Sequence, residues 1–154
     1  QPTYLTDTER KVQITRELLS AVKHLKSEQG NLFTALRARE DYAANNAAKR
    51  MISVIGDLPN LDYLEPGEFL LGDYLKKLKI FVGAYPHADM RIHRDYYESA
   101  GQSVEEFREY VMNNNQQIVQ SIRRQIKILE GELNETVSKI ISERVKRRLK
   151  LLIR

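Results

Sequence analysis

The sequence predicts an all-α protein, an antiparallel bundle of four to five helices whose first and last helices are long. Two stretches carry apolar residues at helical spacing, one from Val12 to Ile55 and one over the last third of the chain. Between them, residues 57–67 contain two prolines and a glycine, which favour a loop. No strand pattern of convincing length is present. Because a long amphipathic helix cannot bury its apolar stripe alone, we expect the two long helices to pack on each other and on the shorter ones.

The first long helix begins at a capping box, with the Thr6 hydroxyl at the cap and the Glu9 carboxylate three residues later. An apolar stripe at helical spacing follows, made of Val12, Ile14, Leu18, Val22, Leu25, Leu32 and Leu36. Gly30 interrupts this stripe, which indicates a kink or a close approach of another element. The alanine-rich segment 42–48 either continues the helix or begins a second one, and the sequence Gly-Asp-Leu-Pro at 56–59 ends the helical stretch.

A short helix is predicted over Glu68 to Val82. Its inward side chains are Phe69, Leu70, Tyr74, Leu75, Leu78 and Phe81. Gly83 and Pro86 end this helix. A further short helix over Met90 to Tyr97 is one interpretation of the segment that follows, and Gly101 interrupts it.

The last long helix is predicted from Ser103 to Arg154, because Ser103 and Glu106 form a second capping box and no proline follows. Apolar residues recur along it every eleven residues, at Ile118, Leu129, Ile140 and Leu151, with Ile122, Ile126, Leu133 and Val137 between them. Eleven residues make three turns of about 3.67 residues each, so this stripe stays on one face of the helix. A helix of about 50 residues is ~75 Å long, which exceeds the needs of a domain this size and is typical of a connecting element.

Composition limits the classes of function. The 154 residues are 42% hydrophobic and 30% charged, which fits a single globular domain over residues 1–154. Cysteine is absent, which excludes disulfides, thiolate zinc sites, iron–sulfur clusters and cysteine nucleophiles. The apolar runs are too short to cross a bilayer. Because Gln1 is not a methionine, we expect the domain to be excised from or trimmed out of a longer chain.

Residues with metal-ligand chemistry gather once, at His87, Asp89, His93 and Asp95. Imidazole and carboxylate groups bind zinc and similar ions, but this spacing matches no established ligand motif. A polar loop with exposed or hydrogen-bonded histidines is the simpler interpretation, so no metal site is predicted. The motifs of phosphate-binding loops, dinucleotide folds, serine hydrolases and zinc proteases are also missing. We therefore expect no catalytic residue, no cofactor and no enzyme activity.

Positive charge is concentrated at the C-terminal end of the chain. Residues 145–154 hold no acid and five cations, namely Lys146, Arg147, Arg148, Lys150 and Arg154. Residues 1–144 hold 20 basic and 21 acidic side chains, so the excess of charge belongs to one helix end. Cations are favoured in the last turn of a helix, although this effect does not account for five of them. The other interpretations are phosphate binding, on nucleic acid or lipid, and a helix end that lies beside a membrane.

Residues 25–36, with the sequence LKSEQGNLFTAL, resemble the first helix of the nitrate/nitrite-sensing (NIT-type) domains of bacterial sensor kinases and chemoreceptors. That helix carries a leucine, then Glu-Arg-Gly, then small residues, and Gln29 stands here at the arginine's position. Arg37 and Arg39 lead into an alanine-rich helix, as in the family. The segment 147–149 is similar to the basic step before the second membrane span of such receptors. The resemblance implies an all-helical bundle with long first and last helices.

From the layout and the resemblance we expect a non-catalytic sensory input domain of a bacterial receptor, on the extracytoplasmic side of the membrane or, alternatively, in the cytoplasm. A small anionic ligand is expected between the helices near Arg37, Arg39 and Arg50. Its binding would shift the first and last helices against each other by about 1–2 Å, and the last helix would carry the shift to an output domain. A homodimer through the long helices is expected.

The alternative hypothesis is an interaction or assembly subunit of a larger complex, whose basic C-terminal helix contacts nucleic acid or an acidic partner. The segment Ser142 to Leu152 is loosely similar to the closing helix of the N-terminal domain of GINS replication subunits. The usual accompaniments of nucleic-acid binding, aromatic residues between the cations and a helix-turn-helix pattern, are missing. Salt-sensitive binding of DNA or RNA that is lost when Lys146, Arg147 and Arg148 become alanine would favour this alternative.

Overall fold

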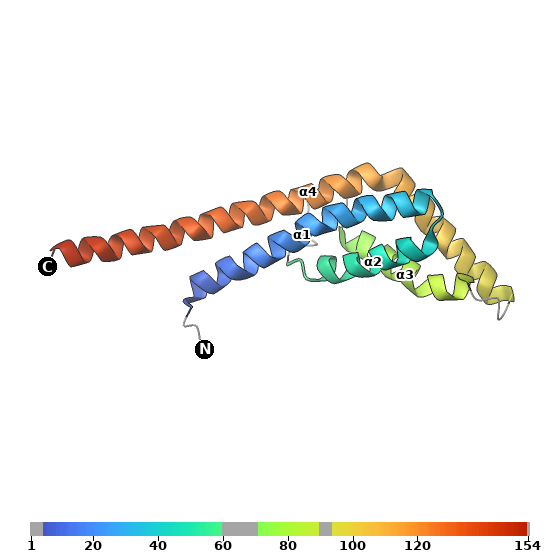
Figure 1. The fold of residues 1–154 in the computed structure, drawn as a ribbon, viewed down its shortest axis with the longest axis horizontal. Helices are drawn as coiled ribbons and strands as arrows, with labels where there is room; N and C mark the ends of the chain where they lie inside the picture. Colours follow the sequence, from blue (N-terminus) through green and yellow to red (C-terminus); the bar gives the residue numbers. More distant parts are fainter. Residues whose placement is uncertain (1–4, 60–70, 90–93, 154) are drawn as a thin grey trace.

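Four helices make up the described chain, and the prediction of an all-α bundle with long first and last helices is confirmed (Figure 1). The computed structural model describes residues 5–59, 71–89 and 94–153, and the side chains of 86–98 lie outside this description. The helices are α1 (Asp7–Arg37), α2 (Asp41–Gly56), α3 (Leu71–Asp89) and α4 (Arg94–Ile153). The described residues contain no strand.

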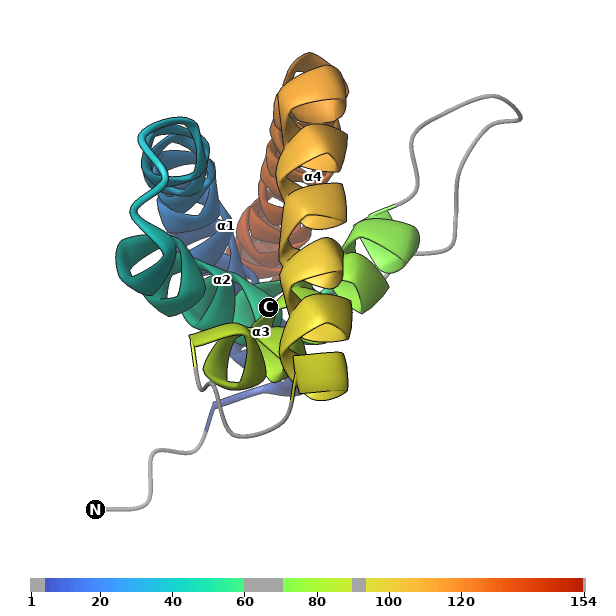
Figure 2. The same ribbon diagram turned by 90° about the vertical axis from the view of Figure 1, so that its right-hand side faces the viewer.

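The helices pack in a closed ring, in which α1 and α3 each contact both α2 and α4. α1 and α4 are antiparallel. Gln29, late in α1, contacts Asn115, whereas Glu9, at the start of α1, lies beside Ile140. The first part of α4 points in a different direction from its orange and red remainder, which follows α1 (Figure 1). Figure 2 shows α1 and α2 together on one side of α4, with α3 crossing near its base. The start of α1 and the end of α4 therefore lie at the same end of the bundle.

The start of α1 follows the predicted capping box. Thr6 Oγ1 accepts a hydrogen bond of 3.1 Å from the Glu9 amide. Gly30 lies inside the continuous helix, and a Cβ added there would meet no atom within 4 Å. The close approach expected at Gly30 is therefore wrong. Ile14 departs from the predicted apolar stripe, because its side chain is 57% exposed.

The first helical stretch is interrupted after Arg37, so the alanine-rich segment begins a second helix. Arg39 has a φ of 58°, in the left-handed region. Its amide donates to the carbonyl of Leu36, and the next amide, that of Glu40, donates to the carbonyl of Ala35. These two bonds form a Schellman motif, with an arginine at the position where glycine is usual. The reversed chain direction lays α2 against α1.

The helices α3 and α4 continue through residues that the sequence analysis treated as ends. α3 runs through Gly83 and Pro86, and α4 runs through Gly101. The predicted capping box at Ser103 is wrong as well, because its hydroxyl donates to the Ser99 carbonyl inside α4. A glycine within a helix costs only about 1 kcal/mol relative to alanine, an amount that tertiary packing can offset.

The core lies where the four helices meet. Phe81 of α3 stacks on Phe107 of α4 with ring centroids 4.6 Å apart. The buried face of α2 carries three alanines, Ala44, Ala47 and Ala48, beside larger side chains. The fully buried core residues of α1, α2, α3 and α4 include Val22, Leu32, Leu36, Ala44, Ala48, Met51, Ile55, Tyr74, Leu78, Phe81, Val111, Ile118 and Ile122.

The eleven-residue repeat of α4 is buried over only part of its length. Ile118 and Leu129 are buried and Ile140 is half-buried, whereas Leu151 is 69% exposed. Every residue from 141 to 153 is exposed, so the last turns of α4 project beyond the bundle (Figure 1).

Candidate functional site

A chain of hydrogen bonds joins α1, α3 and α4 inside the bundle. The Tyr74 hydroxyl donates to Gln29 Oε1 at 2.6 Å, and Gln29 Nε2 donates to Asn115 Oδ1 at 3.0 Å. Tyr74 and Gln29 are both 0% exposed. Burial raises the pKa of the Tyr74 hydroxyl, against a smaller opposing effect of its hydrogen bond to Gln29. The network is therefore neutral and fixes one register of α1 against α4. We refer to these three residues as the core triad.

One residue of the core triad, Gln29, could have been recognised from the sequence as a buried polar residue. Gln29 stands between Leu25 and Leu32 at helical spacing, so it occupies a position of the buried stripe. A polar residue at such a position needs a hydrogen-bond partner. The identity of that partner depends on which helices face α1, and that is set by the tertiary structure.

A second polar cluster surrounds Arg108 of α4, whose side chain is only 8% exposed. Its Nη2 donates to Asp41 Oδ1 at 2.7 Å, its Nε donates to the Leu36 carbonyl at 3.1 Å, and its Nη1 pairs with Glu105. Arg108 thus ties the end of α1 and the start of α2 to α4. Arg108 was not predicted as a functional residue, because an arginine between Phe107 and Glu109 has the sequence pattern of an ordinary surface cation.

Glu105 joins this cluster to Arg39, with Arg39 Nη1 at 2.7 Å from Glu105 Oε1. Hydrogen bonds from the guanidinium groups of Arg108 and, next, Arg39 hold the pKa of Glu105 below its ordinary value of 4.5. The charged pairs therefore lie where the left-handed turn between α1 and α2 meets α4. We refer to Arg39, Asp41, Glu105 and Arg108 as the arginine cluster.

The three arginines that were predicted to bind an anion lie at the end of α1, in the turn that follows it and on α2. Arg37 is exposed at the end of α1, close in sequence to Arg39, which pairs with Glu105. Arg50 lies farther along α2 and pairs with Glu28 of α1 at 2.9 Å. An anion at Arg39 or Arg50 would compete with the carboxylate that each of them already pairs with. Their role as ligand contacts stays a prediction.

Asn45 of α2 is a further buried polar residue, with 4% of its surface exposed. Its Oδ1 has no hydrogen-bond partner within the described part of the chain. Buried acceptors are almost always paired in proteins. Asn45 Oδ1 is therefore an unpaired hydrogen-bond acceptor, within the described residues, on the buried face of α2.

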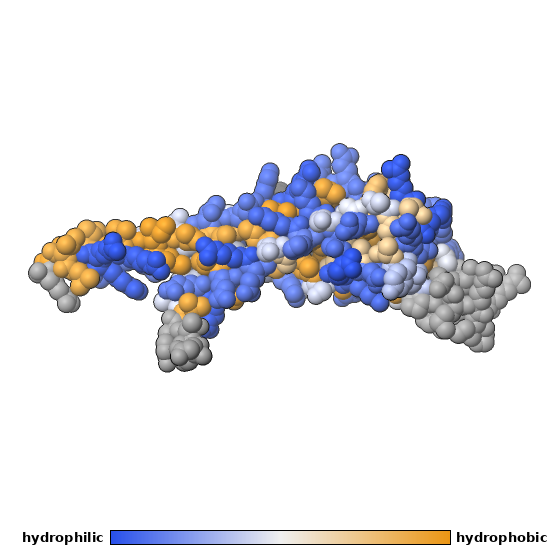
Figure 3. Space-filling view, viewed as in Figure 1, coloured by the Kyte–Doolittle hydropathy of each residue, from blue (hydrophilic) through white to orange (hydrophobic). Residues whose placement is uncertain are grey.

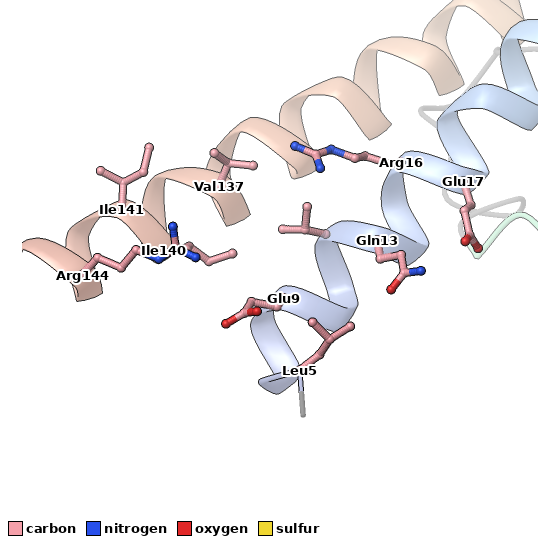
Figure 4. Close-up of a pocket in the computed structure, with 10 residues that line it drawn as sticks. Leu5, Glu9, Gln13, Arg16, Glu17, Val137, Ile140, Ile141 and Arg144 are labelled. Atoms are coloured by element: carbon pink, nitrogen blue, oxygen red, sulfur yellow. The ribbon is translucent and has the colours of Figure 1, made fainter. Parts of the chain in front are cut away.

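An open groove separates the start of α1 from the late part of α4 (Figure 4). Its volume is about 570 Å³, within the size range of small-molecule sites. In Figure 4, Glu9 and Ile140 extend from the two helices into the space between them. The lining is apolar with charged residues at intervals, and consists of Leu5, Glu9, Val12, Gln13, Arg16, Glu17, Val137, Ile140, Ile141 and Arg144. None of the three predicted arginines lines this groove.

The predicted basic patch lies on the projecting end of α4. Lys146, Arg147, Arg148 and Lys150 are all exposed, and none of them forms an ion pair with a described residue. Arg154 lies outside the described residues. The histidine and aspartate side chains at 87, 89, 93 and 95 lie outside them as well.

Within the described residues, no group of three or more histidine and carboxylate side chains is placed to hold a metal ion. No helix there has an apolar window long enough to cross a bilayer. In the described residues, the fold and the sites together define a four-helix all-α bundle whose hydrophobic core contains a buried hydrogen-bond network and whose last helix has a projecting basic end. Comparison with known proteins finds no matching family model, curated protein or solved structure. The resemblance to NIT-type domains therefore continues to depend on residues 25–36 and the layout.

Proposed function

We propose that this chain is a non-catalytic sensory input domain, in which a small ligand changes the packing of α1 against α4. The observation that carries the proposal is the continuity of α4. One helix of 60 residues packs on α3, then on α1, and then projects from the bundle. A displacement of α4 inside the bundle would therefore appear at its free end, on the 1–2 Å scale of interfacial helix shifts.

The core triad supplies a place where the packing can change in discrete steps. A glutamine amide has both donor and acceptor groups, so Gln29 can exchange partners when α4 slides past α1. Tyr74 on α3 and Asn115 on α4 hold it in the present register. A ligand biases such a change only if it binds one packing more tightly than the other.

The groove between α1 and α4 is the site that best supports ligand binding, because both of the helices that would move line it. Its apolar lining favours a small molecule with an apolar body, while two arginines, Arg16 and Arg144, and two glutamates, Glu9 and Glu17, supply charged contacts of both signs. Of the predicted anion contacts, Arg37 and Arg39 lie at the other end of α1, whereas Arg50 lies farther along α2. A homodimer through the long helices and a place beside a bacterial membrane belong to the same proposal.

Paired spin labels test the proposal directly, since the chain has no cysteine and introduced thiols are unique. The exposed positions Ser20 on α1 and Asn134 on α4 report the separation of the two helices. A control pair within α4, Lys127→Cys with Lys139→Cys, should not respond. We expect nitrate or a short-chain fatty acid to shift only the Ser20–Asn134 distance. Distances that remain fixed across a broad panel of small anions and amphiphiles would contradict the proposal.

The alternative function is an assembly subunit, and the exposed cations of α4 favour it specifically. On that hypothesis the basic end contacts nucleic acid or an acidic protein. Replacing Lys146, Arg147 and Arg148 by alanine would then abolish a salt-sensitive complex with duplex DNA or RNA. Neither helix movement nor a small ligand would be needed.

A further inference from the structure

The last turns of α4 form an amphipathic helix that the described chain leaves uncovered. We call residues 141–153 the α4 tail. All of them are exposed, and the tail projects past the start of α1 (Figure 1). Figure 3 shows apolar residues gathered along this end of the molecule, beside strongly hydrophilic ones. Thirteen residues of helix extend about 20 Å, which is long enough to form a surface of its own.

Apolar side chains of the α4 tail share one face. Their spacing of three to four residues places them on a continuous arc of the helix. The members of this arc are Ile141, Val145, Leu149, Leu152 and Ile153, which are 51 to 84% exposed. Leu151 falls on the opposite side.

Cations occupy the remaining faces of the same turns. They are Arg144, Lys146, Arg147, Arg148 and Lys150. The last acidic residue before them is Glu143, and none follows it. The tail thus combines an unpartnered apolar arc with five cations and a single acid, Glu143.

We propose that the α4 tail docks along the surface of an anionic phospholipid bilayer, lying in the plane of the interface. A helix with a strong apolar arc and cations on its other faces inserts that arc at the boundary between headgroups and acyl chains. The long stems of lysine and arginine then let their charged ends reach the phosphate groups. An anionic lipid surface can bind the apolar arc and the cations of the α4 tail at the same time.

Charge argues against a second copy of the same tail as the occupant. Pairing two tails along their apolar arcs would bring five cations from each chain close together, with only the Glu143 carboxylate of each chain to offset them. Like charges facing each other across an interface are unfavourable. Nucleic acid would satisfy the cations but would leave Leu149 and Leu152 in water. The inference does not depend on the sensory role, because the tail has the same faces whether or not the bundle binds a ligand.

The chain contains no tryptophan, so Leu149→Trp gives a unique fluorescent reporter on the apolar arc. Ile80→Trp, at an exposed position of α3, is the matched control. We expect the emission of the first variant to shift to the blue on mixing with phosphatidylglycerol–phosphatidylcholine vesicles, and not with phosphatidylcholine alone. The control should not shift with either.

Vesicle sedimentation measures the contribution of charge. Changing Arg147, Arg148 and Lys150 together to glutamine should weaken partitioning onto the vesicles by roughly a hundredfold, because each cation contributes about fivefold. The control is a triple variant with the exposed Lys23, Lys26 and Lys49 changed to glutamine, and it should partition onto the vesicles as strongly as the unchanged protein.

Three outcomes would overturn the proposal. One is sedimentation with anionic vesicles while the tryptophan at 149 stays in water, which would indicate charge attraction alone. Another is a blue shift without vesicles that grows with protein concentration, which would indicate self-association. The third is binding of duplex DNA, but not of vesicles, that is lost in the tail triple.

Discussion

Tyr74 and Gln29 lie 45 residues apart in the sequence, and in the fold the tyrosine hydroxyl donates to the glutamine side chain at 2.6 Å. Both side chains are completely buried. Gln29 also donates to Asn115, so one amide connects three helices. A buried polar group of this kind stabilises one arrangement of the helices over others, because any shift leaves donors or acceptors without partners.

Tyr74→Phe should lower the free energy of unfolding by about 1–3 kcal/mol, because it leaves Gln29 Oε1 buried without its donor. Urea denaturation followed by circular dichroism measures this change. The double variant Tyr74→Phe with Gln29→Leu should lose less than the sum of the single changes, since the two residues interact directly. Strict additivity of the two effects would contradict the contact.

Arg108→Met should destabilise the fold by about 2–4 kcal/mol, because it removes the partner of a largely buried ion pair and of the Leu36 carbonyl. Arg50→Met is the control, since the Arg50 side chain is 57% exposed and its pair with Glu28 should contribute less than about 1 kcal/mol. Thermal unfolding distinguishes the two variants. Equal losses would mean that Arg108 does not hold α1 and α2 to α4.

Arg39→Gly and Arg39→Ala remove the same ion pair with Glu105 but differ in backbone freedom. Because φ is 58° at this position, the free energy of unfolding of Arg39→Gly should exceed that of Arg39→Ala by about 1 kcal/mol. Chemical denaturation of the two variants measures the difference. Their ligand responses should match, so that any loss of binding shared by both is assigned to the arginine side chain.

Removing residues 141–154 should change the free energy of unfolding by less than about 0.5 kcal/mol, because the described part of this segment is exposed. Ile122→Ala, within the buried part of α4, should cost about 2–5 kcal/mol. A large loss on truncation would show that the α4 tail packs against the bundle. Calorimetry of both proteins provides the comparison.

Stability should fall at alkaline pH. Burial raises the pKa of Tyr110 to about 12, and burial also raises the pKa of Tyr74, so the folded state holds both phenolic protons more tightly than the unfolded state. The resulting stabilisation is complete below the ordinary tyrosine pKa of 10.0 and is lost as the pH rises through the folded-state values. Urea denaturation at increasing pH should show this decline, and Tyr74→Phe should show a smaller one.

The helical class of this chain was predictable because periodicity is a local property. Apolar residues at helical spacing identified the inward faces of α1 and α4, and the Thr6 capping box marked the start of α1 correctly. The basic patch at 146–150 was also visible in the sequence, since it needs only charge counting. The exposure of Leu151 was not visible, because the eleven-residue repeat reaches this residue with the same spacing that it has in the core.

Helix ends in the middle of the chain were predicted less well. Gly83, Pro86 and Gly101 are breakers by propensity, yet the chain continues as helix through all three. Their cost of roughly 1–3 kcal/mol each is offset by the burial of Phe81, Val104 and Phe107 near them. Packing across the bundle decided these boundaries.

The amino-acid sequence by itself determined that this protein is helical, which faces of its helices turn inward and where its charge accumulates, because each of these depends on residues within a few turns of one another. Only the tertiary structure decided that Gln29 meets Tyr74, that Arg108 lies buried beside Asp41 and that α1 and α4 leave a groove at their shared end. Those relationships join residues from different helices, and they follow from the way that whole helices pack rather than from any local spacing.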